Sequence, residues 1–161
     1  MNLSVSLDPV KPNKLEHLYI LFRYSEILLN YAEAMYEWKG ADATADECQM
    51  TARAALNIVR ASADMKNVNA TGEDFREKVR NERRIELAFE GHRFYDIRRW
   101  KIAGKEEVRN IYGVKITKNG DSFSYEKVLL NKMYWNDKMF LFPIPQKEVY
   151  MNHYLWQNPG W

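Results

Sequence analysis

The feature that most constrains this chain is a series of apolar side chains that recur every three or four residues before position 102. That spacing places them on one face of an α-helix, and such a face has to be buried against other elements. The same period predicts helices over about residues 18–39, 44–63, 71–90 and 92–101. In the first helix, the predicted apolar face consists of Ile20, Tyr24, Ile27, Leu28, Tyr31, Met35 and Trp38.

Capping residues set the expected helix boundaries. Gly40 is expected to end the first helix, because glycine readily adopts the left-handed conformation that closes a helix. Thr44 and Glu47 have the spacing of a capping box, which predicts that the second helix begins at Thr44. Gly91 is expected to separate the third and fourth helices. Antiparallel helix pairs with short turns are typical of tetratricopeptide-like folds, although no segment repeats at a fixed period.

The helical period is lost after residue 101. Two β-prone runs within about residues 111–128 flank Asn119 and Gly120, a dipeptide that favours a tight hairpin turn. Residues 129–140 are expected to form a loop, and the terminal segment 140–161 is expected to be largely irregular. The predicted fold class is therefore mainly α, with tetratricopeptide-like helix pairs, a small β-hairpin and irregular C-terminal loops.

The length and composition fit one domain. The chain has 161 residues, of which 46% are hydrophobic and 29% charged, so it can form a core and disorder is not expected. Residues 1–17 lack periodicity, which predicts an extended lead-in before one domain over residues 18–161. The N-terminus has no signal-peptide pattern, and no run reaches the length of a membrane-spanning helix. The single cysteine, Cys48, excludes an internal disulfide.

Charged residues are dense between positions 81 and 101. Three glutamates spaced four apart share one helical face and would suit acid–base or metal chemistry. The neighbouring arginines nearly match the acids in number, so we favour an architectural role, in which ion pairs tie two helices together around Gly91. This interpretation includes no catalytic residue, no metal site and no cofactor. The residues assigned to this motif are Arg83, Glu86, Glu90, Arg93, Asp96, Arg99 and Trp100.

The overall charge balance bears on the class of partner. The chain has 24 basic and 22 acidic residues, giving a net charge of +2. Phosphate binding normally leaves a clear unpaired basic stripe, so nucleic acid is not an expected partner.

Aromatic side chains are concentrated after position 93 and include a neighbouring pair in the predicted loop, Tyr134 and Trp135. Flat aromatic faces stack on sugar rings, and binding side chains tend to lie in loops. Asn131, Asn136 and Asp137 are close in sequence and offer hydrogen-bond partners for hydroxyl groups. Tyr134 and Trp135 are therefore the candidate ligand-binding residues, with a second layer of core packing as the alternative.

Three segments of the chain carry a family resemblance. They are LFRYSEILLNYAEA at 21–34, ERRIELAFEGHRFYDIRRW at 82–100, and FPIPQKE at 142–148 followed by QNPGW at 157–161. Their order and spacing resemble the C-terminal part of the SusD/RagB family of outer-membrane nutrient-binding proteins. The resemblance covers nearly the whole chain from Tyr19 onward.

The resemblance implies a function that spacing alone does not give. Proteins of this family are helical, lipid-anchored at the outer surface of Gram-negative cells, and not enzymes. They bind glycans or other nutrients and cap a SusC-like TonB-dependent transporter, which imports the ligand. The resemblance thus implies an oligosaccharide-binding outer-membrane accessory protein, present here as a C-terminal portion without the signal peptide and lipid-anchor cysteine. The alternative is a tetratricopeptide-like scaffold that binds a protein partner and has no glycan affinity.

Overall fold

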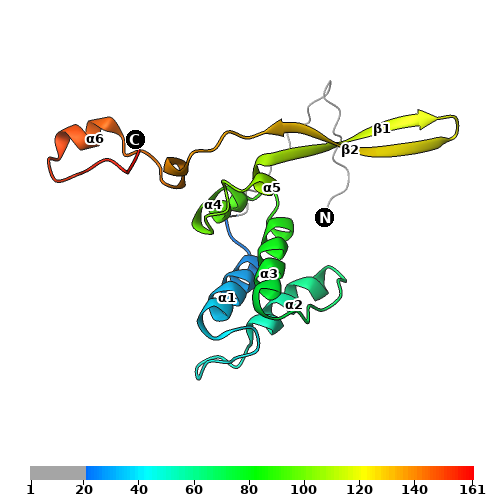
Figure 1. Ribbon diagram of the computed structural model, residues 1–161. Helices are drawn as coiled ribbons and strands as arrows, with labels where there is room; N and C mark the ends of the chain where they lie inside the picture. Colours follow the sequence, from blue (N-terminus) through cyan, green and yellow to red (C-terminus); the bar gives the residue numbers. More distant parts are fainter. Residues whose placement is uncertain (1–20) are drawn as a thin grey trace, which may run out of the picture. The chain divides into compact units, whose positions relative to one another are not determined.

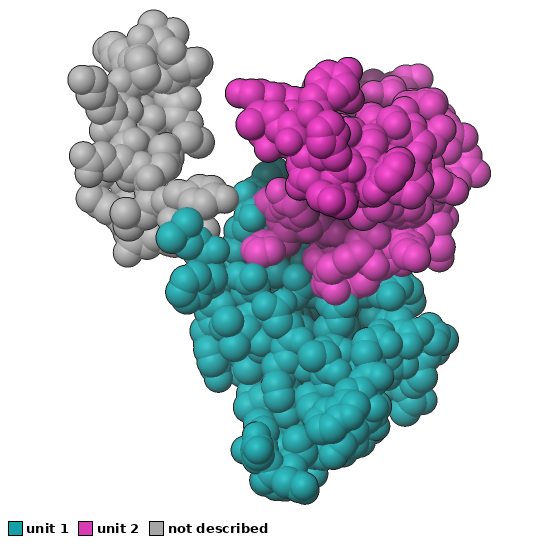
Figure 2. Space-filling model, turned by 90° about the vertical axis from the view of Figure 1, so that its left-hand side faces the viewer, with its two compact units in different colours: residues 1–90 teal, residues 91–161 magenta. Residues whose placement is uncertain are grey.

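The computed structural model of the protein describes residues 21–161, and Figure 1 shows the course of the chain. The chain divides into two compact units, residues 1–90 (unit 1) and residues 91–161 (unit 2), which are coloured separately in Figure 2. The division falls inside the range 18–161 that the sequence pattern assigns to one domain. The predicted lead-in, 1–17, lies outside the described residues.

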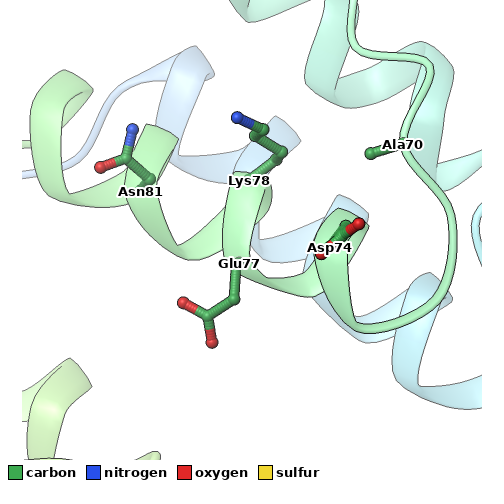
Figure 3. Close-up of a pocket in the computed structure, with 5 residues that line it drawn as sticks. All are labelled: Ala70, Asp74, Glu77, Lys78 and Asn81. Carbon is green, nitrogen blue, oxygen red and sulfur yellow. The ribbon is translucent and has the colours of Figure 1, made fainter.

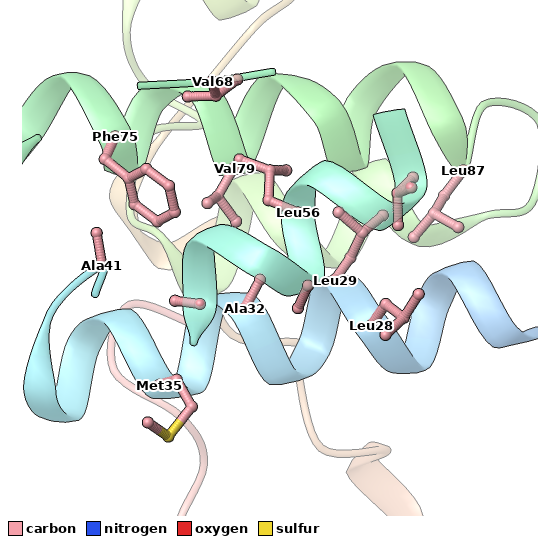
Figure 4. Packing of buried hydrophobic residues seen from close by; sticks show 13 residues of the cluster. Leu28, Leu29, Ala32, Met35, Ala41, Leu56, Val68, Phe75, Val79 and Leu87 are labelled. Carbon is pink, nitrogen blue, oxygen red and sulfur yellow. The ribbon is translucent and has the colours of Figure 1, made fainter. Parts of the chain in front are cut away.

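The described part of unit 1, residues 21–90, contains three helices, α1 (Tyr24–Lys39), α2 (Ala52–Ser62) and α3 (Gly72–Glu86). Helix α1 contacts both α2 and α3, so the three helices share one core. Figure 4 shows Leu29, Leu56 and Val79 pointing into the space between them. The fully buried Ala32 and Ala55 carry small side chains, which let neighbouring helices approach closely.

Unit 2 contains shorter elements and little core. Its elements are α4 (His92–Arg99), α5 (Glu106–Arg109), β1 (Asn110–Asn119), β2 (Ser122–Lys132), the 3₁₀-helix η1 (Asp137–Phe140) and α6 (Gln146–Met151). The buried residues of unit 2 are Asp96, Ile97 and Ala103. With six α-helices and one two-stranded antiparallel sheet over the described residues, the prediction of a mainly α fold with a small hairpin is confirmed.

The predicted start of the first helix is wrong. Helix α1 begins at Tyr24 rather than near residue 18, because Arg23 has an extended backbone with φ −146° and ψ 166°. The predicted helix included residues 18–23, and of these residues 18–20 lie outside the described part of the chain. The predicted apolar face is also only partly correct, since Tyr24, Ile27 and Trp38 are exposed. The buried residues of α1 are Leu28, Leu29, Ala32 and Met35.

The predicted start of the second helix, at Thr44, is also wrong. The backbone N–H groups of Ala45 and Cys48 each donate to the other residue's carbonyl oxygen, at 3.1 and 3.0 Å, which closes a tight turn there. Helix α2 begins at Ala52, and the side chain of Thr51 caps it by accepting a hydrogen bond from the Ala54 backbone N–H at 3.0 Å. Thr51 therefore performs the capping role that the sequence pattern assigned to Thr44.

The third and fourth helices both end earlier than predicted. Helix α3 ends at Glu86 rather than residue 90, and Phe89 then adopts a positive φ of 66°. Helix α4 ends at Arg99 rather than residue 101, because Lys101 has a φ of 54°. A positive φ is incompatible with continuing a right-handed helix, so each of these residues marks a reversal of the chain.

The hairpin is longer than predicted. Strand β2 runs on to Lys132, so the first part of the predicted loop 129–140 is strand. Asn119 pairs with Ser122, which leaves Gly120 and Asp121 as a two-residue turn. Gly120 has a φ of 62°, and glycine is the residue that adopts this conformation most easily.

Candidate binding site

The charged residues of α3 connect it to both other helices of unit 1. Arg60 of α2 donates from its Nη1 atom to Glu82 Oε2 at 2.6 Å, and both side chains are largely buried. Arg83, with a side chain only 4% exposed, donates to Asn30 Oδ1 at 2.6 Å and lies 3.6 Å from Glu33 Oε2. These contacts join α3 to α2 and α1.

Glu86 and Glu90 are both bound by Arg23, the residue that precedes α1. Arg23 Nη1 donates to Glu86 Oε1 at 2.5 Å, and its Nε donates to Glu90 Oε1 at 2.9 Å. Burial lowers the pKa of Arg23, but the hydrogen bonds to Glu86 and Glu90 outweigh this effect and hold its pKa above the ordinary value. Through Arg23, the two carboxylates therefore hold the residue that precedes α1 close to the C-terminal end of α3.

Of the remaining motif residues, Arg93, Asp96 and Arg99 lie on α4 and Trp100 directly follows it. Asp96 is buried and accepts from Arg99 Nε at 2.9 Å. The Arg99 guanidinium lies 4.8 Å from the centre of the Trp100 ring, and that of Arg93 lies 6.0 Å from the same centre. These four residues form one local cluster within unit 2.

Tyr134 and Trp135 lie between the end of β2 and η1. The segment is fixed at its start, because Met133 N–H donates to the Arg109 carbonyl at 2.9 Å and Arg109 Nε donates to the Met133 carbonyl at 2.8 Å. The side chain of Tyr134 is exposed, at 72%. A ring held on an anchored segment and open to solvent is available for stacking.

Trp135 differs from its neighbour because its ring is packed. Its indole lies edge-on to Phe140 at 4.8 Å between ring centres and donates from Nε1 to Asp137 Oδ1 at 3.2 Å. Gly104 packs so closely on the indole that an added Cβ would lie 2.9 Å from its Cδ1 atom. Within unit 2, Trp135 therefore helps to position the segment.

Arg98 of α4 also contacts this segment. Its guanidinium lies 3.5 Å from the centre of the Phe94 ring and 5.5 Å from that of Trp135. Its Nε donates to the Met139 carbonyl at 3.2 Å. Burial lowers the pKa of Arg98. Sequence reasoning did not single out Arg98, because two of its contacts, Trp135 and Met139, are distant in sequence.

The terminal segment is clamped by its own side chains. Gln157 makes a pair of 2.8 Å hydrogen bonds with Ile144, donating to its carbonyl and accepting from its N–H. Asn158 Nδ2 donates to the Phe142 carbonyl at 2.6 Å, and Trp161 Nε1 donates to the Lys138 carbonyl at 3.0 Å. The QNPGW and FPIP motifs therefore bind each other.

The Gln157→Ala substitution should release this clamp. It removes both hydrogen bonds to Ile144, each contributing about 1 kcal/mol. We expect amide hydrogen exchange at Ile144 to become faster, with little change in α1–α3. The exposed Gln146 is the matched control, and Gln146→Ala should leave exchange at Ile144 unchanged. Equal exchange rates at Ile144 in the wild type and Gln157→Ala would contradict the clamp.

Two adjoining pockets in unit 1 were missed by sequence reasoning. One, of about 520 Å³, is lined by Ala70, Asp74, Glu77, Lys78 and Asn81, and Figure 3 shows that four of these project from α3. The other, of about 580 Å³, lies along the connection from α2 to α3 and is lined by Arg60, Ala63, Met65, Lys66, Asn67, Val68, Asn69, Ala70, Lys78, Asn81, Glu82, Ile85 and Glu86. The first pocket is lined by polar and apolar surface in similar amounts and the second by more apolar than polar surface, and no sequence signal marked either of them.

A metal-binding cluster and a membrane-spanning helix are both absent from the described residues. In residues 21–161, no group of three or more His, Cys, Asp or Glu side chains is arranged to hold a metal ion. No helix in that same range is both long and apolar enough to cross a membrane.

Comparisons with known proteins agree with one another. The sequence profile of the SusD family matches residues 7–161. The chain is 32% identical over 150 residues to SusD-like protein P2 of Formosa agariphila, covering 89% of this chain and 26% of that protein. Its structure is similar to the crystal structure of a SusD-like protein from Bacteroides fragilis, with a TM-score of 0.72, 35% identity, and the same shares of 89% and 26%. The chain thus spans about a quarter of the length of these relatives.

The matched region contains all three segments that carry the sequence resemblance. Family profile, sequence relative and solved structure each identify the same family, and the TM-score shows that the fold is similar to that of the solved structure. SusD-family proteins are binding proteins associated with the outer membrane, generally for nutrients such as glycans. The chain therefore belongs to the SusD family.

Proposed function

We propose that this chain is part of a non-catalytic accessory protein that binds oligosaccharides and passes them to a SusC-like TonB-dependent transporter. Membership of the SusD family over residues 7–161 is the observation that carries the proposal. Because the chain spans 26% of its relatives, the ligand, the transporter and attachment to the cell surface through a lipid anchor are all parts of the proposal.

The ligand contact that we propose within this chain is Tyr134, with Trp135 positioning it. Support comes from the 72% exposure of Tyr134 and from the hydrogen bonds that anchor Met133. Asn136 and Asp137 are already engaged, since Asn136 caps η1 and Asp137 accepts from Trp135. Binding would therefore rest on ring stacking, supplemented by the exposed Asn131.

For the charged motif, we propose a purely architectural role. Glu86 and Glu90 share Arg23 as a partner, whereas glycoside hydrolysis needs two carboxyl groups that flank the substrate. The partners of Glu82 and Arg83 are likewise residues of α1 and α2. That these side chains connect helices supports the architectural role.

The test of glycan binding is titration with neutral oligosaccharides while following tryptophan fluorescence, since Trp135 adjoins the proposed contact. One stacked ring contributes about 1 kcal/mol, so we expect a Kd of roughly millimolar and a loss of about fivefold in Tyr134→Ala. The matched control is Tyr150→Ala, since Tyr150 is similarly exposed, at 75%, in the same unit. Tyr150→Ala should bind as the wild type does.

Other outcomes would count against the proposal. Equal losses in Tyr134→Ala and Tyr150→Ala would show that the contact has been placed wrongly. Co-purification with a transporter, without affinity for any oligosaccharide, would instead support the scaffold alternative.

A further inference from the structure

Three side chains of α2 hold the backbone of the connection from α2 to α3. Arg60 Nε donates to the Lys66 carbonyl at 2.8 Å, and Asn57 Oδ1 accepts from the Val68 N–H at 2.8 Å. Arg53 Nη1 donates to the carbonyl of Val68 at 3.1 Å. The three side chains are spaced three and four residues apart, so they share one face of α2. The larger of the two pockets lies along this connection, and its wall is therefore already in place without a ligand.

The side chains of the connection alternate between the core and solvent. Val68 is 7% exposed and belongs to the hydrophobic core of unit 1. Its neighbours Asn67 and Asn69 are exposed, and both line the larger pocket. Neither carboxamide makes a hydrogen bond to any residue that the structure describes. The pocket thus presents two amide groups that can still donate hydrogen bonds.

Three basic side chains line the same pocket and keep donors that are unused. Arg60 donates from Nε to the Lys66 carbonyl and from Nη1 to Glu82, whereas its Nη2 makes no hydrogen bond in the described part of the chain. Over that same part, the ammonium groups of Lys66 and Lys78 form no ion pair and no hydrogen bond. The two acids of the lining, Glu82 and Glu86, are each bound by an arginine. The unshared charge of the pocket is therefore positive, which favours an anionic ligand.

The size of that anion is limited by the neighbouring surface. Figure 3 shows Lys78 and Asn81 pointing to one side of α3 and Glu77 pointing to the other. Glu77 lies 3.5 Å from Arg80, its partner on the same helix. Asp74 and Glu77 line the smaller, adjoining pocket, so an extended polyanion would meet carboxylates there. A single carboxylate fits this arrangement better.

The lining of the larger pocket also has an apolar part. Met65 and Ile85 line it with exposed fractions of 52% and 59%, and Ala63 lines it as well. Exposed apolar side chains in a pocket stabilise a ligand that buries apolar surface against them. The ligand should therefore carry an apolar group next to its carboxylate.

We propose that the larger pocket of unit 1 binds a small organic acid, whose carboxylate is held by Arg60, Lys66 and Lys78 and whose apolar group packs on Met65 and Ile85. Two kinds of compound supply such a carboxylate, namely peptide C-termini and acidic sugars, and the apolar lining favours the first. The site lies within unit 1 and is independent of the glycan contact proposed in unit 2.

The test is an NMR titration of the chain with three small probes. N-acetyl-leucine has both the carboxylate and the apolar group, and it should shift the backbone amide signals of Asn67 and Asn69 with a Kd of roughly millimolar. N-acetyl-leucinamide has the same shape without the charge and should bind about tenfold more weakly. Galacturonate has the carboxylate without the apolar group and should also bind more weakly than N-acetyl-leucine.

A double variant tests the basic side chains. Lys66→Gln with Lys78→Gln should weaken binding of N-acetyl-leucine by about tenfold. Both side chains are exposed, and the Lys66 carbonyl that Arg60 binds is retained, so the circular dichroism spectrum should not change. The matched control is Lys39→Gln, since Lys39 is an exposed lysine of the same unit outside the lining of the pocket. Tyr134→Ala, which tests the glycan contact, should leave this binding unchanged.

Three results would overturn the proposal. The first is equal affinity for N-acetyl-leucine and its amide, because the basic side chains would then have no role. The second is an equal loss of affinity in the double variant and in Lys39→Gln. The third is tighter binding of galacturonate than of N-acetyl-leucine, which would show that the pocket takes acidic sugars and that its apolar lining does not select the ligand.

Discussion

Replacing Phe75 by alanine should lower the free energy of unfolding of unit 1 by about 3–5 kcal/mol. Phe75 is fully buried in the core between α1, α2 and α3, and its ring centre lies 5.2 Å from that of Tyr36. The Arg53 guanidinium also lies 5.2 Å from the ring centre. The substitution therefore removes apolar burial, an aromatic pair and a cation–π contact, and leaves a cavity. Denaturant titration followed by circular dichroism measures the loss.

Phe89→Ala is the matched control, because it makes the same chemical change in the same unit. Phe89 is fully exposed, so its truncation should alter the unfolding free energy by about 0.5 kcal/mol or less. A Phe75→Ala protein as stable as Phe89→Ala would show that the three helices do not share the core described here.

The second large effect is expected at Glu82. Glu82→Ala leaves the Arg60 guanidinium, whose side chain is 16% exposed, without its carboxylate, and breaking a buried pair in this way costs about 3–5 kcal/mol. Arg60 Nε still donates to the Lys66 carbonyl at 2.8 Å, which holds the side chain in place and prevents it from escaping into water easily. The same denaturant titration measures the effect.

Glu77→Ala is the control for this prediction. Glu77 also pairs with an arginine, Arg80, at 3.5 Å, but its own side chain is 69% exposed. Exposed pairs contribute little, so the control should lose about 0.5 kcal/mol or less. If Glu82→Ala lowered the free energy of unfolding no more than Glu77→Ala does, burial of the Arg60–Glu82 pair would have no energetic consequence. That result would contradict the architectural role proposed for the charged residues of α3.

The charged segment illustrates how far sequence reasoning reached. The near equality of acids and bases between positions 81 and 101 predicted ion pairs between the two helices on either side of Gly91, and that mutual pairing stays a prediction. The arginine that holds Glu86 and Glu90 is Arg23, which is 63 and 67 residues away in sequence. Helical spacing relates a residue only to neighbours three or four positions away, so it could not identify a partner on another element.

The aromatic pair shows the same limit at the candidate site. Tyr134 and Trp135 are adjacent and chemically similar, and the sequence treated them alike. Only the packing of Gly104, Phe140 and Arg98 distinguishes them, because these residues enclose the indole of Trp135 and leave Tyr134 exposed. Exposure depends on which distant side chains cover a ring.

By itself, the sequence determined the mainly helical class, the hairpin turn at Gly120 and the family. These follow from local patterns: apolar spacing, a turn glycine and motifs in a fixed order. The tertiary structure decided where α1 and α2 begin, which side of α1 is buried and which arginine meets each carboxylate. The physical reason is that a helical period shows which residues can share a face, whereas the elements packed against that face determine what is buried and paired.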